Sequence, residues 1–200
     1  MGKPAGVVAA LKLVSTRVML QPRVTDDKQL YASWRIPGSY FNRMLDCGDR
    51  YNPSVQIALE YLPREILDEH KDRLAFVGMG QRDGCRLSRA LCETREIVVL
   101  AERVFPRAGA DEGQPEFRYF VYVVLHEVAH AIKRHRSPLY DSLTPQQNAD
   151  QEAEADDLAF KWFNEHIEAL ANASLPQLSR QEIEVAKARS RECMEDRYNG

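Results

Sequence analysis

The sequence lacks a long uncharged apolar run, has few cysteines and carries no excess of basic residues. No segment approaches the roughly 18 consecutive apolar residues of a membrane-spanning helix. The four cysteines show no C-x-x-C spacing and are too sparse for the disulfide scaffold of a small secreted domain, so we expect free thiols. The formal net charge of -3 gives no electrostatic case for binding nucleic acid or an anionic membrane. We therefore expect a soluble cytoplasmic protein with neither kind of partner.

The length of 200 residues and the hydrophobic content of 44% suit a single domain with a sizeable core. Residues 1–50 mix turn signals with large aromatic side chains such as Trp34, Tyr40 and Phe41. We expect them to form an irregular N-terminal extension packed on a domain of residues 51–200. The alternative is that this aromatic segment binds a partner.

Apolar periodicity and end signals predict both helices and strands, so the expected fold class is α+β. The predicted strands are residues 74–80 and 95–100, separated by the turn signal Asp83-Gly84 and by a segment, Cys85 to Cys92, that fits either a strand or a helix. They indicate a short antiparallel sheet, with Ile97 to Leu100 as an edge on which an extended peptide can add as a strand. The predicted helices span residues 52–61, 63–71, 115–134, 144–171 and 179–197.

One short segment carries chemistry, the H-E-x-x-H pattern His126-Glu127-Val128-Ala129-His130. Residues four apart lie on one face of a helix, so both imidazoles can bind one metal ion while Glu127 reaches a water molecule bound to it. The alternative is a chance pattern of polar residues satisfied in the core. Residues 117–125 are almost wholly apolar or aromatic, which buries the helix, and a buried His or Glu without a partner is costly. This context favours the metal site.

A catalytic zinc ion usually takes three protein ligands and keeps a position for water, so the two histidines need a third ligand. His135 is near in sequence, but on a continuing helix it projects about 140 degrees away from His130. It is also one position short of the third His in the extended pattern H-E-x-x-H-x-x-G-x-x-H, and Lys133 replaces its Gly. Asp141 can reach the site only if the chain folds back after Pro138.

The strongest candidate for the third ligand is Glu152, on the next predicted helix. Glu152 and Asp156 share a helix face at the four-residue spacing. One carboxylate can then bind the metal while the other hydrogen-bonds a ligand imidazole and fixes its tautomer. The alternative, a solvated acidic face, suits Glu154 and Asp157 better than it suits this pair.

In these residues the chain resembles the gluzincin metallopeptidases, in which H-E-x-x-H is followed on a later helix by E-x-x-x-D or E-x-x-A-D. Glu152-Ala153-Glu154-Ala155-Asp156 fits the second motif. The nearest soluble resemblance is to the ImmA/IrrE-type metallopeptidases of phage and bacteria, and it covers residues 117–163. The resemblance implies a zincin-like domain with zinc bound by His126, His130 and Glu152 and with Asp156 behind them.

The expected function is therefore that of a zinc metalloendopeptidase, a hydrolase acting on a protein or peptide substrate. Zinc activates a water molecule, and Glu127 serves as the general base. A donor to the developing oxyanion is also needed, and the candidates include His135 and Tyr140. The alternative is a non-enzymatic regulatory or interaction module that keeps a metalloprotease fold around a structural zinc ion. Glu127 disfavours it, because a structural site has no use for a general base.

Overall fold

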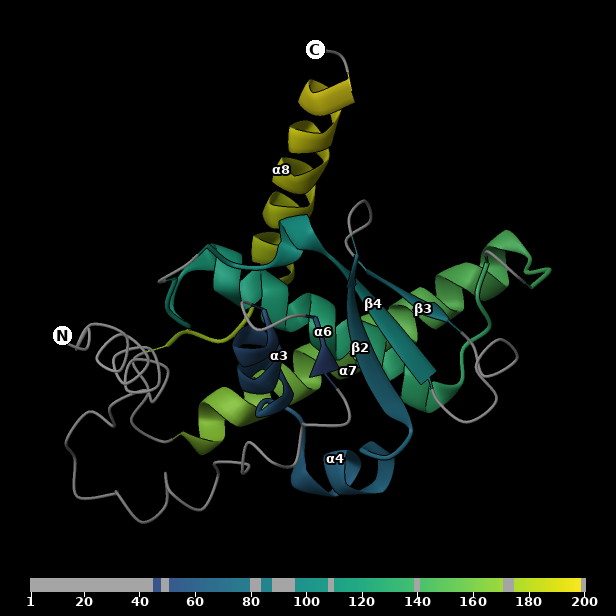
Figure 1. Cartoon of the computed structure of the whole chain (residues 1–200), viewed down its shortest axis with the longest axis horizontal. Coiled ribbons are helices and arrows are strands. Elements are labelled where there is room, and N and C mark those ends of the chain that lie inside the picture. The colour runs from purple at the N-terminus through teal and green to yellow at the C-terminus, as the bar shows by residue number, and fades with distance from the viewer. Residues whose placement is uncertain are drawn as a thin grey trace, which may run out of the picture. The chain divides into compact units, whose positions relative to one another are not determined.

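The computed structural model describes residues 45–47, 51–79, 84–87, 96–107, 110–138, 141–170 and 175–198, all within one compact unit of residues 36–200. These residues form a mixed arrangement of helices and strands, in agreement with the predicted α+β class (Figure 1). Of the predicted N-terminal extension, only residues 45–47 are described. Among the described residues, no helix is both long and apolar enough to cross a bilayer.

The sheet has four strands in the order β1-β2-β4-β3. The strands are β1 (Leu45–Asp46), β2 (Leu74–Met79), β3 (Gly84–Leu87) and β4 (Glu96–Ala101). β2 is parallel to both β1 and β4, and only β3 runs antiparallel to its neighbour β4. The expectation of an antiparallel sheet was therefore wrong for the two strands identified from sequence, although both strands exist.

The physical reason for the sheet order is the burial of β4. Val98, Val99, Leu100 and Ala101 are consecutive and all are at most 9% exposed, so both faces of this strand are covered. A strand buried on both faces is expected in the interior of a sheet. β4 accordingly lies between β2 and β3 and does not form an antiparallel hairpin with β2. The expectation that Ile97 to Leu100 form a sheet edge was therefore wrong. Among the described strands, the edges are β1 and β3.

Five helices lie in the described part of the chain, and their positions agree with the predicted ranges to within a few residues. They are α3 (Asn52–Leu59), α4 (Arg64–His70), α6 (Pro115–Lys133), α7 (Pro145–Ala169) and α8 (Arg180–Tyr198). A short 3-10 helix, η2 (Glu102–Val104), follows β4.

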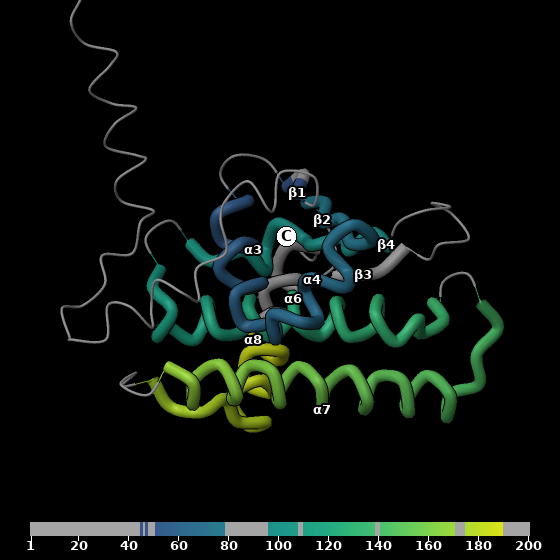
Figure 2. Tube along the Cα trace, turned by 90° about the horizontal axis from the view of Figure 1, so that it is seen from below, coloured from purple at the N-terminus to yellow at the C-terminus, as the bar shows by residue number. Residues whose placement is uncertain are grey.

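Helix α6 is the centre of the core, because 13 of its 19 residues are buried. Pro115 begins it, at the position where a missing backbone N–H costs nothing. The sheet lies on one side of α6 and α7 runs along the other (Figure 2). Ala155 and Ala159 of α7 are completely buried, and their small side chains let the two helices approach closely.

The start of α7 is fixed by a capping box. The hydroxyl of Thr144 accepts a hydrogen bond from the backbone N–H of Gln147 at 3.1 Å, and the side chain of Gln147 accepts one from the N–H of Thr144 at 3.0 Å. This arrangement satisfies two backbone donors that the first turn leaves open. It therefore sets which residues of α7 face α6.

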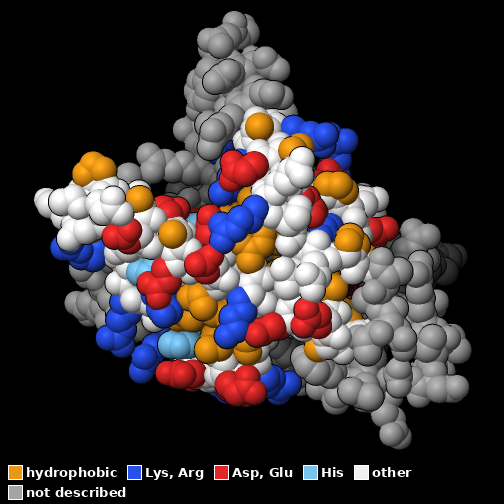
Figure 3. Space-filling view, turned by 180° about the vertical axis from the view of Figure 1, so that it is seen from behind, with side chains coloured by type: hydrophobic (Ala, Val, Ile, Leu, Met, Phe, Trp, Pro, Cys, Tyr) orange, Lys and Arg blue, Asp and Glu red, His pale blue; other side chains and the backbone are white. Residues whose placement is uncertain are grey.

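Surface charge is distributed without large regions of one sign on the face shown in Figure 3, where acidic and basic side chains are interspersed. Val185, at 47% exposure, is the one large hydrophobic side chain that is exposed among the described residues. The expected absence of a nucleic-acid partner stays a prediction.

A half-buried histidine in α7 is expected to make the stability of the fold depend on pH. Burial lowers the pKa of His166 from 6.5 to about 4, and its ring stacks on Tyr61 with 4.1 Å between ring centroids. The imidazole of His166 therefore binds a proton more readily in the unfolded chain than in the native protein. The contribution of the neutral ring to the free energy of unfolding is complete above pH 6.5 and is lost as the pH falls towards 4.

We expect His166→Phe to remove that dependence. The free energy of unfolding of the wild type, measured in urea from pH 7 to pH 4, should fall relative to that of the variant by up to about 3 kcal/mol, because the native ring resists protonation. The comparison between the two proteins cancels the titration of every other group. Parallel curves over this range would contradict the prediction.

Candidate metal centre

The two histidines of the H-E-x-x-H pattern lie one turn apart in the second half of α6. Val128 and Ala129 between them are completely buried, which fixes this part of the helix against the core. The Nε2 atoms of His126 and His130 are 3.0 Å apart, so the rings converge on one point. Their side chains are only 12% and 11% exposed.

Glu152 reaches the same point from α7. Its Oε2 lies 3.3 Å from Nε2 of His126, and its Oε1 lies 3.5 Å from Nε2 of His130. The three residues form a group that could hold a metal ion, with the donor atoms all within 4.8 Å of one another. An ion that holds ligands tetrahedrally at about 2.0 Å places them about 3.3 Å apart, and the observed separations fit such an ion.

Asp156 and Tyr122 lie on the Nδ1 side of His126. Its Nδ1 atom is 2.9 Å from Oδ1 of Asp156, an ion-pair distance. The hydroxyl of Tyr122 donates a hydrogen bond to the same carboxylate oxygen. Burial and this carboxylate raise the pKa of Tyr122 well above its usual range, so the phenol keeps its proton. Oδ1 of Asp156 therefore lies between the phenol of Tyr122 and Nδ1 of His126.

The site has a negative field that favours a cation. Burial alone would lower the pKa of His126, but the carboxylates of Asp156, Glu152 and Glu127 outweigh it and raise this pKa to about 9. In turn, His126 and His130 hold the pKa of Glu152 well below its usual range. A field that favours a proton on a buried imidazole also favours a divalent cation in its place.

Glu127 lies on α6 between the two histidines and is half-buried. Its charge contributes to the raised pKa of His126. Glu152, by contrast, has a side chain that is 49% exposed. The donor group is therefore open to solvent on the side of α7.

His135 occupies a different place from the one expected. Its Nδ1 atom lies 2.8 Å from Nδ1 of His130, and its Nε2 atom lies 3.0 Å from Oε2 of Glu154. Both ring nitrogens are therefore taken up behind His130, and neither is available for an oxyanion. The helical projection failed because α6 ends at Lys133, before His135 is reached.

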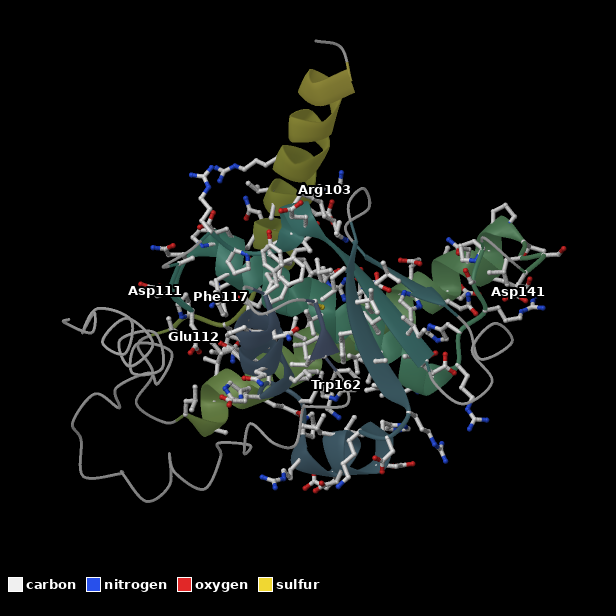
Figure 4. All side chains as sticks on the ribbon, in the orientation of Figure 1. Arg103, Asp111, Glu112, Phe117, Asp141 and Trp162 are labelled. Atoms are coloured by element: carbon white, nitrogen blue, oxygen red, sulfur yellow. The ribbon has the colours of Figure 1, made fainter. Side chains whose placement is uncertain are left out.

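The remaining candidates are placed as follows. Tyr140, the other expected oxyanion donor, lies outside the described residues. Asp141, the alternative third ligand, lies in the connection between α6 and α7 (Figure 4), where its Oδ2 accepts a hydrogen bond from the backbone N–H of Ser137 at 2.8 Å. It stabilises this turn, whereas Glu152 is the carboxylate that meets the two histidines.

Sequence reasoning missed Glu154, which was assigned to a solvated face. Its carboxylate contacts Lys133 at 2.5 Å as well as His135, and these two residues lower its pKa, Lys133 more strongly. Two features of the sequence could have indicated this contact. His135 lies just beyond the end of the helix that carries H-E-x-x-H, and Glu154 is an acid two residues after Glu152. Asp157, by comparison, forms an exposed pair with Arg180.

Comparison with family models, with curated proteins and with solved structures finds no match to this chain. The function is therefore inferred from the geometry and chemistry of the site.

Proposed function

We propose that this protein is a zinc-dependent metallopeptidase that hydrolyses peptide bonds in a protein or peptide substrate. The observation that carries the proposal is the convergence of His126, His130 and Glu152 from two packed helices, with Glu127 next to His126 in the sequence. Two imidazoles and one carboxylate are the ligand set of several catalytic zinc sites, and they leave a coordination position open. The proposed fold is zincin-like, on the resemblance of the two helical motifs.

The exposure of the site favours a catalytic ion over a structural one. Structural zinc sites are usually closed by four protein ligands. Among the described residues, three donors converge here, and the side chain of Glu152 is 49% exposed, so water and a substrate can approach. This favours the enzyme over the non-enzymatic module with a structural ion.

Zinc bound at this site would polarise the scissile carbonyl and lower the pKa of water towards about 7. The carboxylate of Glu127 takes the proton of the attacking water as its oxygen bonds to the carbonyl carbon. Glu127 then gives that proton to the amide nitrogen, the carbon–nitrogen bond breaks, and the amine leaves. The carboxylate ends the cycle as it began.

The other residues of the site keep the donors in place. Asp156 lies 2.9 Å from Nδ1 of His126, while the Nε2 atom of this ring faces Glu152. Tyr122 donates to Asp156 and fixes that carboxylate in turn. Such partners of metal-binding histidines set ring orientation and increase the basicity of the ligand.

The test of the ligand set is the zinc content of purified protein. The wild type should contain close to one equivalent of zinc, and His126→Ala and Glu152→Ala should each lose most of it, because two remaining donors bind the ion weakly. Glu165→Ala, a change at an exposed carboxylate on the same helix, should leave the zinc content unchanged. Full occupancy without Glu152 would contradict the proposed third ligand.

A further inference from the structure

His135 lies directly beyond the end of α6 and packs its ring against that of His130. The centroids of the two rings are 4.9 Å apart and the planes make an angle of 75°. His135 is only 7% exposed although it belongs to a connecting segment. A buried polar side chain in such a segment needs hydrogen-bonding partners, and both of its ring nitrogens have them.

The turn that ends α6 brings the two rings together. Arg134 takes the left-handed conformation with φ 56°, and the backbone N–H of His135 donates to the carbonyl of His130 at 3.0 Å. The N–H of Arg134 donates to the carbonyl of Ala131. This pair of bonds is the Schellman motif, in which the residue after the left-handed one packs back on the last full turn of the helix. The backbone thus places His135 against a proposed metal ligand.

The far side of His135 is held by α7. Glu154 contacts Nε2 of His135 through one carboxylate oxygen and Nζ of Lys133 through the other. Gln151, one turn earlier, clamps the same connection to α7. Its side chain accepts from the N–H of Arg136 at 2.8 Å and donates to the carbonyl of Arg136 at 3.1 Å.

This chain of contacts on the Nδ1 side of His130 favours a proton on that nitrogen when Nε2 binds a metal ion. The carboxylate of Glu154 can only accept, so Nε2 of a neutral His135 donates to it and Nδ1 of that ring is left as an acceptor. Nδ1 of His130 must then donate to Nδ1 of His135. The proton of His130 is then on Nδ1, and its Nε2, 3.5 Å from Oε1 of Glu152, is left to bind a metal ion.

We propose that His135 and Glu154 are positioning residues that hold His130 in the Nδ1–H tautomer, with its metal-binding Nε2 directed at Glu152. The inference rests on the proposed function of the site as a zinc centre. It assigns a separate role to each of three acidic residues of α7, Glu152, Glu154 and Asp156. Glu152 is the metal ligand, Asp156 orients His126, and Glu154 orients His130 through an intervening imidazole.

The experiment combines the zinc dissociation constant, from competition with a chelator, with long-range ¹H–¹⁵N NMR spectra of the metal-free protein. We expect His135→Phe, which keeps a ring but removes the acceptor, to weaken zinc binding by about 10- to 100-fold. His135→Asn, which keeps an acceptor at the δ position, should restore most of the affinity. The spectra should show His130 as the Nδ1–H tautomer in the wild type and as a mixture in His135→Phe.

A second variant, at an exposed position, keeps the test valid if His135→Phe does not fold. The side chain of Glu154 is 47% exposed, so Glu154→Ala should fold normally and weaken zinc binding by about threefold or more. Glu165→Ala, which removes a comparable exposed pair with Lys161 on the same helix, should have no effect.

The possible results separate this inference from the proposed function. Absence of zinc binding by the wild type would overturn the proposed function. Zinc binding by the wild type, with His135→Phe and Glu154→Ala both within twofold of it, would overturn the positioning role alone. An Nε2–H tautomer of His130 in the metal-free wild type would also overturn that role, whatever the zinc affinity.

Discussion

Glu127→Gln is expected to lower the rate of peptide hydrolysis by about 10²- to 10⁴-fold while leaving zinc bound. The amide has nearly the same size as the carboxylate but cannot take a proton from water, so the contribution of the general base is lost. The ligands His126, His130 and Glu152 are untouched. The measurement is kcat/KM on a library of peptides derived from cellular proteins, together with the zinc content of the same samples.

Glu116→Gln is the matched control for this variant. Glu116 lies in the first turn of the same helix, with a side chain that is 43% exposed, and it should be replaceable without loss of activity. If Glu127→Gln retained zinc and more than a tenth of the wild-type activity, another residue would have to serve as the base. If the wild type cleaved no peptide of the library, the proposed activity would be contradicted for substrates of that kind.

Glu182→Ala is expected to destabilise the fold by about 3 kcal/mol, because it leaves a buried guanidinium without its counter-charge. Arg118 is 2% exposed, and its Nε and Nη2 atoms lie 2.6 Å and 3.0 Å from the two carboxylate oxygens of Glu182. Its Nη2 atom also donates to the carbonyl of Gln177, and its guanidinium lies 5.1 Å from the centroid of the Phe163 ring. The free energy of unfolding in urea is the measurement.

The structure supplies an exposed pair for comparison. Arg180 and Asp157 also join α8 to α7, at 2.5 Å, but their side chains are 64% and 70% exposed. Asp157→Ala should therefore cost less than about 1 kcal/mol. The double variant Arg118→Met/Glu182→Leu should recover most of the lost stability, since it removes the buried charge altogether. Equal effects of Glu182→Ala and Asp157→Ala would show that burial of the pair does not matter.

The positions of helices and strands were predictable because their signals are local. Pro115 at the start of α6 and the capping box at Thr144 act within a single turn, and the sequence shows both. The order of the strands was not predictable in the same way. It depends on the pairing of β4 with both β2 and β3 and on its packing against α6, and these contacts join separate segments of the chain.

In the candidate site, too, the local spacings were predictable from the sequence and the other contacts were not. Residues four apart share a helix face in any α-helix, so the pairs His126 with His130 and Glu152 with Asp156 follow from spacing alone. His135 was misplaced because the projection assumed a continuing helix. The chain reverses instead at Arg134, a residue with positive φ where glycine would be the usual signal.

The sequence by itself determined which side chains share a face, because the period of the helix is a property of the backbone and needs no partner. Only the tertiary structure decided that the two faces meet, since the contact between α6 and α7 depends on buried small residues such as Ala155 and Ala159 and on the turn between the helices. It also decided the task of Glu154, because an exposed acid acquires one only from the residues that packing brings to it. Here those residues are Lys133 and His135.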